Sequence, residues 1–323
     1  MELKDRNILV TGAAGFIGSH LCDALVKDNK VIGYDNLSSG KEEMIEHLED
    51  EPNFELVVGD ILDEEALSEQ MKRCDMVFHL AANPDVRVGA EDTYVHLEQN
   101  IIGTYNVLET MRKNGVEEIV FTSSSTVYGE TEVIPTPEDL GPLKPISLYG
   151  SSKLSCEALI SSFCETFDMR SVSFRFANVV GPRSTHGVTY DFVQKLKEDP
   201  TELEILGAPP GTSKSYFYID DCIDGMLYAT RNSEKSVEFF NLGSEDYITV
   251  KRIADTVCEE MGLEEVDYNW TEESGGDKGG WEGDVEVMLL SLEKMKNLGW
   301  SPTYDSAETI AKTVRALTSD NKN

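Results

Sequence analysis

The chain has few basic residues, no long apolar run and no regular cysteine spacing, and each shortage argues against a class of protein. Only 28 Lys and Arg stand against 60 Asp and Glu, which gives a net charge of −32. Such a surface repels nucleic acids and anionic membranes, so neither is an expected partner. Because no stretch of roughly 18 apolar residues occurs, no membrane span is expected either.

Cysteine and histidine give no sign of cross-links or metal ligands. The six cysteines are scattered without a Cys-x-x-Cys pair, which favours reduced, buried thiols over disulfides. The five histidines show no ligand spacing, so no metal is predicted. We recognise no secretory signal in the first residues, and the expected location is the cytoplasm.

Acidic residues follow the whole chain in short pairs, such as Glu42-Glu43 and Glu264-Glu265, and do not form a tail. Solvated acidic helix faces explain this pattern. Adaptation to a salty cytoplasm, in which ions screen the self-repulsion, explains it equally well. At 323 residues the chain can bury one large α/β core or two domains.

Strand and helix patterns alternate through the first half. Short apolar runs end at glycine or polar positions, and helical patterns lie between them near 63–72, 93–113 and 149–167. Near-continuous apolar strands separated by helices are typical of a parallel sheet covered on both faces. We therefore predict an α/β fold with ligands at the carboxyl ends of its strands.

After about residue 177 the alternation breaks down, and Pro and Gly separate shorter elements. We predict two domains and a tail. A nucleotide-binding domain covers 1–176 with a return segment at about 215–243, a smaller C-terminal substrate-binding lobe covers 177–214 and 244–317, and residues 318–323 fray.

A glycine-rich turn, Thr11-Gly-Ala-Ala-Gly-Phe-Ile-Gly18, lies between the first strand and the first helix. The glycines Gly12, Gly15 and Gly18 allow a tight turn and the close approach of a pyrophosphate, which a helix N-terminus also favours. A plain glycine turn is the alternative. The motif sits where a Rossmann-type doubly wound parallel sheet holds its dinucleotide.

Asp35 strengthens the dinucleotide interpretation, because it ends the next strand about 20 residues after the central glycine. Its carboxylate can accept hydrogen bonds from ribose hydroxyls and repels a 2′-phosphate, which favours NAD over NADP. Asn36, Ser38 and Gly40 offer a further short polar turn, and Asp60 follows the third strand. Asp60 can accept from the adenine amino group or cap a helix, and Asp35 can also be a turn residue.

Tyr149 and Lys153 stand four residues apart on a predicted helix, so their side chains share one face. A nearby ammonium and an oxidised nicotinamide both favour phenolate, which makes Tyr149 a candidate base. A Tyr-x-x-x-Lys pair also occurs by chance. Here it follows a serine run, Ser123 to Ser125, in which we choose Ser124 as the hydroxyl that bonds the reacting oxygen. Ser123 and Ser125 can equally be turn or cap hydroxyls.

These motifs together resemble the extended short-chain dehydrogenase/reductases. The motifs are the glycine turn with Asp-Asn-Leu-Ser-Ser-Gly, His79-Leu-Ala-Ala82, Ser-Ser-Ser-Thr-Val-Tyr-Gly, Tyr149-Gly-Ser-Ser-Lys153 and Arg175-Phe-Ala-Asn-Val-Val-Gly-Pro182. The resemblance covers nearly the whole chain and is nearest to the nucleotide-sugar 4-epimerases of the UDP-glucose 4-epimerase type. It implies tightly held NAD, a UDP-sugar substrate, and a homodimer formed through the helices near 93–113 and 149–167.

The resemblance also extends the set of expected cofactor contacts. Besides the turn and the polar residues above, the expected cofactor-binding residues include Tyr149, Lys153, Phe16, Ile17, Ile61, Leu80, Ala81, Ala82, Asn100 and Ser123.

The residues before Val127-Tyr-Gly narrow the reaction. In the resembled family, dehydratases carry an acidic pair there and decarboxylases a glutamate, whereas this chain has Ser125 and Thr126. We therefore expect oxidation at the sugar C4 to be followed by return of the hydride to the other face, which is epimerisation. Thr126 is expected at the sugar, although it can also be a buried strand-end residue.

Substrate contacts in the C-terminal part are implied by the resemblance alone. Asn178 is expected at the phosphate–sugar region or as a turn residue, Lys214 where relatives often have arginine, and Asp284 at the nucleotide ribose. Together with Ser124, Ser125, Thr126 and Tyr149, these form the expected substrate site. A net oxidoreductase, another nucleotide-sugar enzyme such as a 4,6-dehydratase, and an NAD-binding sensor or scaffold are the alternatives.

Overall fold

The computed structural model describes residues 1–271 and 285–319. The chain divides into two compact units. The first comprises Met1–Gly129, Pro142–Arg175 and Ile223–Phe240, and the second comprises Glu130–Gly141, Phe176–Cys222 and Asn241–Asn323. The predicted division of binding roles between two domains remains a prediction.

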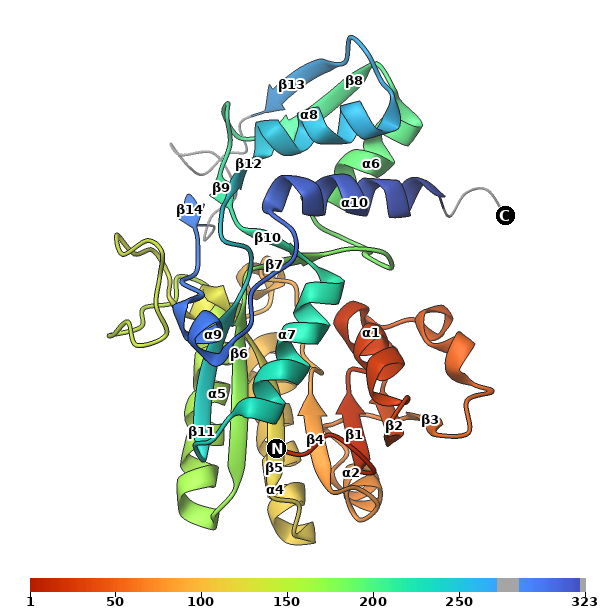
Figure 1. Cartoon of the computed structure of the whole chain (residues 1–323), viewed down its shortest axis with the longest axis vertical. Coiled ribbons are helices and arrows are strands. Elements are labelled where there is room, and N and C mark those ends of the chain that lie inside the picture. The colour runs from red at the N-terminus through yellow and green to blue at the C-terminus, as the bar shows by residue number, and fades with distance from the viewer. Residues whose placement is uncertain (272–284, 320–323) are drawn as a thin grey trace. The chain divides into compact units, whose positions relative to one another are not determined.

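The first unit is built on a seven-stranded sheet (Figure 1). Its strands are β1 (Asn7–Thr11), β2 (Lys30–Asp35), β3 (Phe54–Val58), β4 (Met76–His79), β5 (Glu118–Ser124), β6 (Arg170–Phe176) and β11 (Val237–Leu242). They follow the order β11-β6-β5-β4-β1-β2-β3. β1 pairs in parallel with β2 and β4, β2 with β3, and β4 with β5. The first strand therefore lies inside the sheet, with the chain winding outward on both sides of it.

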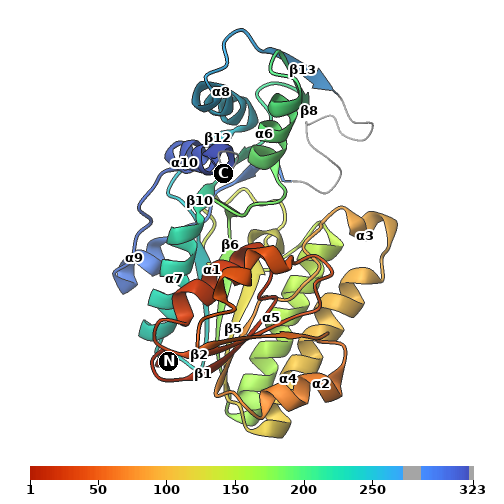
Figure 2. The same ribbon diagram turned by 90° about the vertical axis from the view of Figure 1, so that its right-hand side faces the viewer.

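Helices cover both faces of this sheet. They are α1 (Phe16–Leu25), α2 (Glu64–Met71), α3 (Val88–Glu91), α4 (Gly103–Asn114), α5 (Leu148–Phe167) and α7 (Ile219–Asn232), with short helical turns η1 (Glu42–Met44), η2 (Glu46–Leu48), η3 (Leu97–Ile102) and η4 (Ser125–Val127). Figures 1 and 2 show α1 and α7 on one face and α2, α4 and α5 on the other. This arrangement confirms the predicted Rossmann-type doubly wound fold.

The core of the first unit explains why its strands read as continuous apolar runs. All four residues of β4 are buried, because helices cover both sides of the sheet. On one face, Val77 and Ile119 of the strands pack with Leu108 of α4 and Ile160 of α5. The helices present their apolar positions to the sheet at helical spacing.

The second unit contains smaller sheets and a helical layer. Its elements are β7 (Asn178–Val180), α6 (Val188–Glu198), β8 (Glu202–Leu206), β9 (Ser213–Lys214), β10 (Tyr216–Tyr218), β12 (Ile248–Thr249), α8 (Val250–Met261), β13 (Asp267–Thr271), β14 (Val287–Met288), α9 (Glu293–Leu298) and α10 (Ser306–Ser319). Three small sheets have the orders β10-β7, β12-β9-β14 and β13-β8. Phe192, Leu203, Ile253 and Ile310 are buried together in its core.

Three details differ from the sequence predictions. The helix expected over 93–113 begins as a π-helical segment, η3, which continues into α4 at Gly103. Thr318 and Ser319, expected to fray, belong to α10. Residues 130–141, which no pattern singled out, belong to the second unit, where the Asn241 side-chain amide donates to the Thr136 carbonyl. Among the described residues, no helix combines the length and apolar character that crossing a membrane requires.

Candidate active site

The glycine turn between β1 and α1 is packed too closely for side chains. Gly12 has a φ of 72°, and a Cβ there would lie 2.7 Å from the backbone nitrogen of Ala81. At Gly18 a Cβ would lie 2.0 Å from the Gly12 carbonyl oxygen. At Gly15, the N-cap of α1, a Cβ would meet only that same oxygen, at 3.3 Å. A side chain there would fill open space beside the helix N-terminus, so the turn fits the pyrophosphate of a dinucleotide.

Asp35 is fixed beside this turn at the end of β2. Its Oδ2 accepts from the Ala14 N–H at 2.9 Å, and its Oδ1 accepts from the Leu37 N–H at 2.8 Å. The side chain is buried, and each oxygen keeps a second lone pair. Those lone pairs can accept the two ribose hydroxyls, so the carboxylate also fits the predicted NAD.

The polar turn after Asp35 is joined to the end of β3. Asn36 donates its side-chain amide to Asp60 at 2.9 Å and accepts from the Ser38 N–H at 3.0 Å. The other carboxylate oxygen of Asp60 accepts from the Leu62 N–H at 2.8 Å. A Cβ on Gly40 would lie 2.9 Å from the Ala14 carbonyl oxygen, so this turn lies directly against the glycine turn.

Other predicted cofactor residues also lie at this edge of the sheet, but some have internal roles. Leu80, Ala81 and Ala82 directly follow β4, while Phe16 and Ile17 begin α1. Ile61 is buried and packs against Gly103 of α4.

The side-chain amide of Asn100 is hydrogen-bonded within the protein. Its Oδ1 accepts from the Asn83 N–H at 2.8 Å, and its Nδ2 donates to Ser152 at 2.9 Å. Ser123 is equally committed, since its hydroxyl donates to Glu157 at 2.6 Å. Their predicted contacts with the cofactor remain predictions.

Ser124, Tyr149 and Lys153 come together where β5 ends and α5 begins. The Ser147 side chain caps α5, accepting from the Gly150 N–H at 3.1 Å, so Tyr149 lies in the first helical turn. Ser124 accepts from the Thr126 N–H at 3.2 Å and from its hydroxyl at 3.0 Å. Its own hydroxyl hydrogen is therefore available to the Tyr149 phenol, with which it is hydrogen-bonded.

Lys153 lies beneath this pair and is buried. Its ammonium donates to the Thr122 carbonyl at 2.8 Å and lies 4.9 Å from the Phe121 ring centre and 5.8 Å from that of Tyr149. Ser124, Ser125 and Thr126 are half-buried, whereas Ser123 is buried. The open side of the site therefore presents the hydroxyls of residues 124 to 126 and the phenol.

The electrostatics differ from the sequence expectation. Burial raises the pKa of Tyr149 to about 12, and the hydrogen bond with Ser124 opposes that rise. Burial also lowers the pKa of Lys153 to about 8. Desolvation penalises the charged form of both groups and outweighs the attraction that we expected to favour phenolate. The pyridinium ring of bound, oxidised NAD would supply the additional positive charge.

A buried ion pair behind the serine run was not predicted. Arg175 of β6 donates through Nε and Nη2 to Glu157 of α5 at 2.9 and 2.8 Å, and through Nη1 to the Tyr128 hydroxyl at 3.0 Å. Glu157 also accepts from Ser123. Glu157 lies four residues after Lys153, and its charge raises the pKa of that amine. The four-residue spacing of Lys153 and Glu157 is visible in the sequence, but the pairing of Glu157 with Arg175 on β6 is not.

A second internal network links β1 to α5 through His79. Thr104 donates to the Cys156 sulfur at 3.2 Å, so its oxygen accepts from His79 Nε2 at 2.9 Å. His79 Nδ1 then accepts from the Thr11 hydroxyl at 2.7 Å. Burial, aided by the charge of Lys153, lowers the pKa of His79 to about 3, so this imidazole stays neutral.

Two of the expected substrate residues of the C-terminal part, Asn178 and Lys214, lie in the second unit. The Asn178 side chain donates to the Ser215 carbonyl at 3.1 Å, and Lys214 is half-buried on β9. Asp284 lies outside the described residues. The assignment of all three to the substrate remains a prediction.

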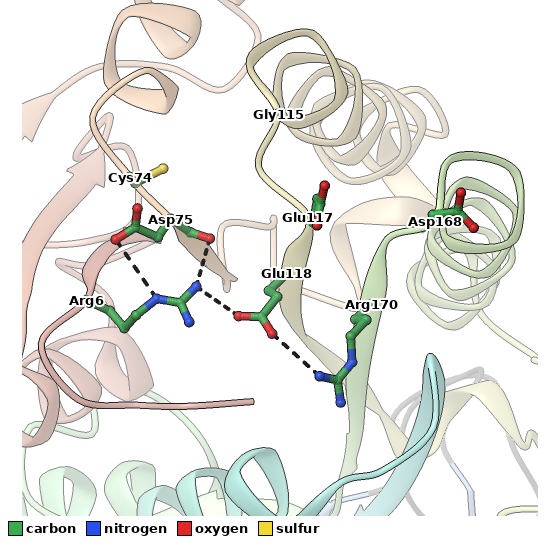
Figure 3. Close-up of a pocket in the computed structure, with 8 residues that line it drawn as sticks. All are labelled: Arg6, Cys74, Asp75, Gly115, Glu117, Glu118, Asp168 and Arg170. Carbon is green, nitrogen blue, oxygen red and sulfur yellow. Dashed lines mark hydrogen bonds and ion pairs between the residues drawn. The ribbon is translucent and has the colours of Figure 1, made fainter.

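A cavity of about 330 Å³ in the first unit is separate from these residues (Figure 3). Arg6 and Arg170 line it, and both pair with Glu118. Because Glu118 begins β5 and Ser124 ends it, the cavity lies at the amino end of the strand. Its arginines are taken up by carboxylates, so it offers no free anion site.

A doubly wound sheet with a glycine turn after β1 and a Ser/Tyr/Lys group at β5 and α5 defines a dinucleotide-dependent enzyme of the short-chain dehydrogenase/reductase type. Comparison with known proteins specifies it further. The sequence model of the NAD dependent epimerase/dehydratase family matches residues 8–243. The chain belongs to this family, whose cofactor is NAD.

The relatives are nucleotide-sugar epimerases. A putative UDP-glucose 4-epimerase of Methanocaldococcus jannaschii is 32% identical over 324 residues, covering 98% of this chain and 99% of the relative. A crystal structure of a UDP-galactose 4-epimerase superposes with a TM-score of 0.86 at 40% identity, covering 97% and 99% of the two chains. A UDP-glucuronic acid 4-epimerase from Bacillus cereus, solved with UDP-glucuronic acid and NAD, has the same TM-score at 30% identity and the same coverage. These findings confirm the family that the motifs resemble.

Proposed function

We propose that the protein is an NAD-dependent 4-epimerase of UDP-hexoses, with UDP-glucose and UDP-galactose or their N-acetyl forms as substrates. The observation that carries the proposal is the meeting of Ser124, Tyr149 and Lys153 at the edge of the sheet where the glycine turn also lies. Parallel strands bring their carboxyl ends to one edge, so β1, β4 and β5 all end there.

Each residue has a distinct task in the proposed cycle. Bound NAD supplies the reversible two-electron oxidation of the C4 alcohol. Tyr149 accepts the C4 hydroxyl proton and returns it after the 4-keto sugar has turned its other face. Ser124 would turn its one hydroxyl hydrogen from Tyr149 to the C4 oxygen when the sugar binds, because both of its lone pairs accept from Thr126. Lys153 supplies positive charge below the phenol.

The residues beside Ser124 favour epimerisation over dehydration. Elimination of water needs a second acid and base beside the sugar, and Ser125 and Thr126 carry only hydroxyls there. The Thr126 hydroxyl is in any case donated to Ser124. With no carboxylate at this position, the keto sugar is reduced again rather than dehydrated.

Product stereochemistry tests this function. We expect the purified protein, incubated with a panel of UDP-, dTDP- and GDP-sugars, to form the C4 epimer of a UDP-hexose by proton NMR, without net NADH. Tyr149→Phe should lower kcat by at least about 100-fold, the usual contribution of a general base. Tyr247→Phe, at an exposed tyrosine, is the matched control.

Three outcomes would contradict the proposal. A released 4-keto-6-deoxy sugar would identify a dehydratase, and accumulating NADH a net oxidoreductase. Binding of NAD without any turnover would favour the sensor.

The cytoplasm remains our expected location, since all six cysteines are buried free thiols.

We further propose that α4 and α5 form the interface of a homodimer. Apolar side chains lie exposed on these helices and on η3: Leu97 and Ile102 are 44% and 37% exposed, and Tyr105 and Phe167 are 45% and 43% exposed. Exposed apolar side chains on two neighbouring helices are unusual on so acidic a surface and indicate an interface. In a homodimer they would be buried against the same face of a second copy.

The mass of the particle in solution tests the interface. Light scattering should give twice the chain mass, and Ile102→Glu should convert the protein to monomer. Leu206→Glu places the same charge at an exposed leucine of the second unit and should leave the dimer intact. A wild-type monomer at every concentration would contradict the proposal.

A further inference from the structure

A π-helical segment places two polar side chains behind the catalytic tyrosine. The segment η3 has π-helical geometry. This geometry is rare in proteins, but where it occurs it is often at a functional site. His96 directly precedes it and Asn100 lies within it, and both are almost fully buried. The His96 ring lies 5.7 Å from the Tyr149 ring, centre to centre, at an interplanar angle of 66°. This is an edge-to-face contact, and it limits how the phenol can tilt.

The hydrogen bonds of Asn100 determine which nitrogen of His96 carries the proton. Asn100 Oδ1 accepts from the Asn83 N–H, so the amide nitrogen Nδ2 is the atom near His96 and Ser152, and it also lies 3.3 Å from the Asn83 carbonyl oxygen. That nitrogen donates to Ser152 and lies 3.2 Å from His96 Nδ1. His96 Nδ1 is therefore an acceptor, and the proton of the neutral ring lies on Nε2.

The same network reaches the backbone of the catalytic residue. The Ser152 hydroxyl donates to the Tyr149 carbonyl at 2.7 Å and accepts from Asn100 at 2.9 Å. His96 thus contacts Tyr149 twice, once through its ring and once through Asn100 and Ser152. The second of these contacts requires a neutral imidazole whose Nδ1 lone pair accepts from Asn100.

The surroundings of His96 favour that neutral form. Burial is the largest effect and lowers its pKa, while the backbone and charge of Asp85 raise it and the charge of Lys153 lowers it. Tyr149 is a further titratable group that faces the ring. The balance keeps the pKa below its ordinary value, so His96 gains a proton only in acid.

We propose that His96 is a positioning residue for Tyr149 and that its protonation switches the enzyme off in acid. The proposal rests on the proposed function, in which Tyr149 is the base. A proton on Nδ1 would point at the Asn100 amide hydrogens, so the amide must turn and lose its bonds to Asn83 and Ser152. The new charge would also repel Lys153.

The pH profile of kcat tests this inference. Below the His96 pKa, wild-type kcat should fall about tenfold per pH unit more steeply than protonation of Tyr149 alone produces, as expected when a second proton inactivates the site. His96→Asn keeps an acceptor near Nδ1, and His96→Phe keeps the ring; neither titrates. Protonation of Tyr149 leaves an acid limb in every variant, so both His96 variants should lose only the additional steepness, whereas His47→Asn, at an exposed histidine, should retain it. His96→Phe should also lose about fivefold in kcat at pH 8, through one missing hydrogen bond.

A spectroscopic measurement separates this inference from the proposed function. The ring resonances of Tyr149, assigned through Tyr149→Phe, should shift with the protonation of His96 in wild type and stay constant in His96→Asn over the same pH range. Nitrogen spectra of the histidines should show His96 as the Nε2–H tautomer at pH 8. These readouts need no turnover. An acid limb as steep in both variants as in wild type, a Tyr149 resonance that does not respond to His96, or the Nδ1–H tautomer would each overturn the inference.

Discussion

Glu157 and Arg175 show how much of the active site depends on residues that never meet the substrate. Their side chains are only 3% and 5% exposed, so each charge depends on the other for compensation. Glu157 also accepts from Ser123, the neighbour of Ser124. The pair therefore joins α5 to β5 and β6 behind the site.

Removing one partner should be costly. We expect Arg175→Met to lower the free energy of unfolding by about 3–5 kcal/mol, since it leaves a buried carboxylate without a cation. The measurement is urea unfolding followed by circular dichroism. The double variant Arg175→Met with Glu157→Leu should recover most of the loss.

An exposed pair provides the comparison. Arg252 bonds Glu259 with side chains 50% and 61% exposed, so Arg252→Met should cost less than about 1 kcal/mol. Equal losses at Arg175 and Arg252 would show that burial of the first pair does not matter for stability.

Residues in local motifs could be read from the sequence, and residues joined through the fold could not. Tyr149 and Lys153 share a helix, so four-residue spacing places them together. The His79 network joins Thr11 to Thr104, and these meet only after β1, β4 and α4 have assembled. The effect of burial on the pKa of Tyr149 could not be predicted either, because spacing reveals neighbours but does not reveal desolvation.

At the scale of elements, the start of α5 is set by its contact with η4. A Cβ on Gly150 would lie 2.7 Å from the Thr126 carbonyl oxygen, 3.1 Å from Pro145 Cβ and 3.2 Å from Ser147 Oγ. The carbonyl oxygen belongs to backbone and cannot move away alone. Glycine at this position therefore lets the Tyr149 turn approach the residues that hold Ser124.

Gly150→Ala should separate these two elements. Alanine alone would favour the helix by about 1 kcal/mol, but here the added methyl must push α5 away from η4. We expect kcat to fall at least about tenfold, since proton transfer needs hydrogen-bond distance between Tyr149 and the substrate oxygen. Steady-state kinetics measures the loss, and circular dichroism checks that the helix remains.

Gly141→Ala is the matched control. Apart from its chain neighbours, no atom of the described residues lies within 4 Å of a Cβ at Gly141, so this methyl should change neither kcat nor folding. If Gly150→Ala turned over at the wild-type rate, the close contact between α5 and η4 would not position the tyrosine.

The π-helical geometry of residues 97–102 could not be predicted from the sequence pattern. Apolar periodicity predicted one helix over 93–113, and it is helical for most of that range. The π-helical turn adds no signal of its own to the sequence. It follows from the need to bury His96 and Asn100 against α5 while Gly103 packs on Ile61.

For the whole molecule, the fold could be predicted from the alternation of strands and helices. Parallel strands that are buried on both faces form nearly continuous apolar runs in the sequence. The composition of the second unit was harder to predict. It takes in residues 130–141, which lie between two elements of the first unit in sequence. Their place depends on bonds such as those of Asn241, which join segments about 100 residues apart.

The net charge of −32 leads to a prediction that concerns the whole surface. Like charges on a folded chain repel each other over about 10 Å at 0.1 M salt and over about 3 Å at 1 M. We therefore expect the melting temperature to rise between about 0.1 and 1 M KCl. Each kcal/mol gained corresponds to roughly 2–4 °C, and differential scanning calorimetry measures the shift.

A charge-reversed variant separates screening of this repulsion from general effects of salt. Glu49, Asp50 and Glu51 are exposed and adjacent, so replacing all three by lysine reduces the repulsion without touching the core. This variant should melt higher than wild type at low salt and gain less on addition of KCl. Salt also strengthens apolar burial, but that effect should be the same in both proteins. If both gained equally, or if wild type melted at one temperature throughout, the acidic residues would be solvated helix faces without adaptation to salt.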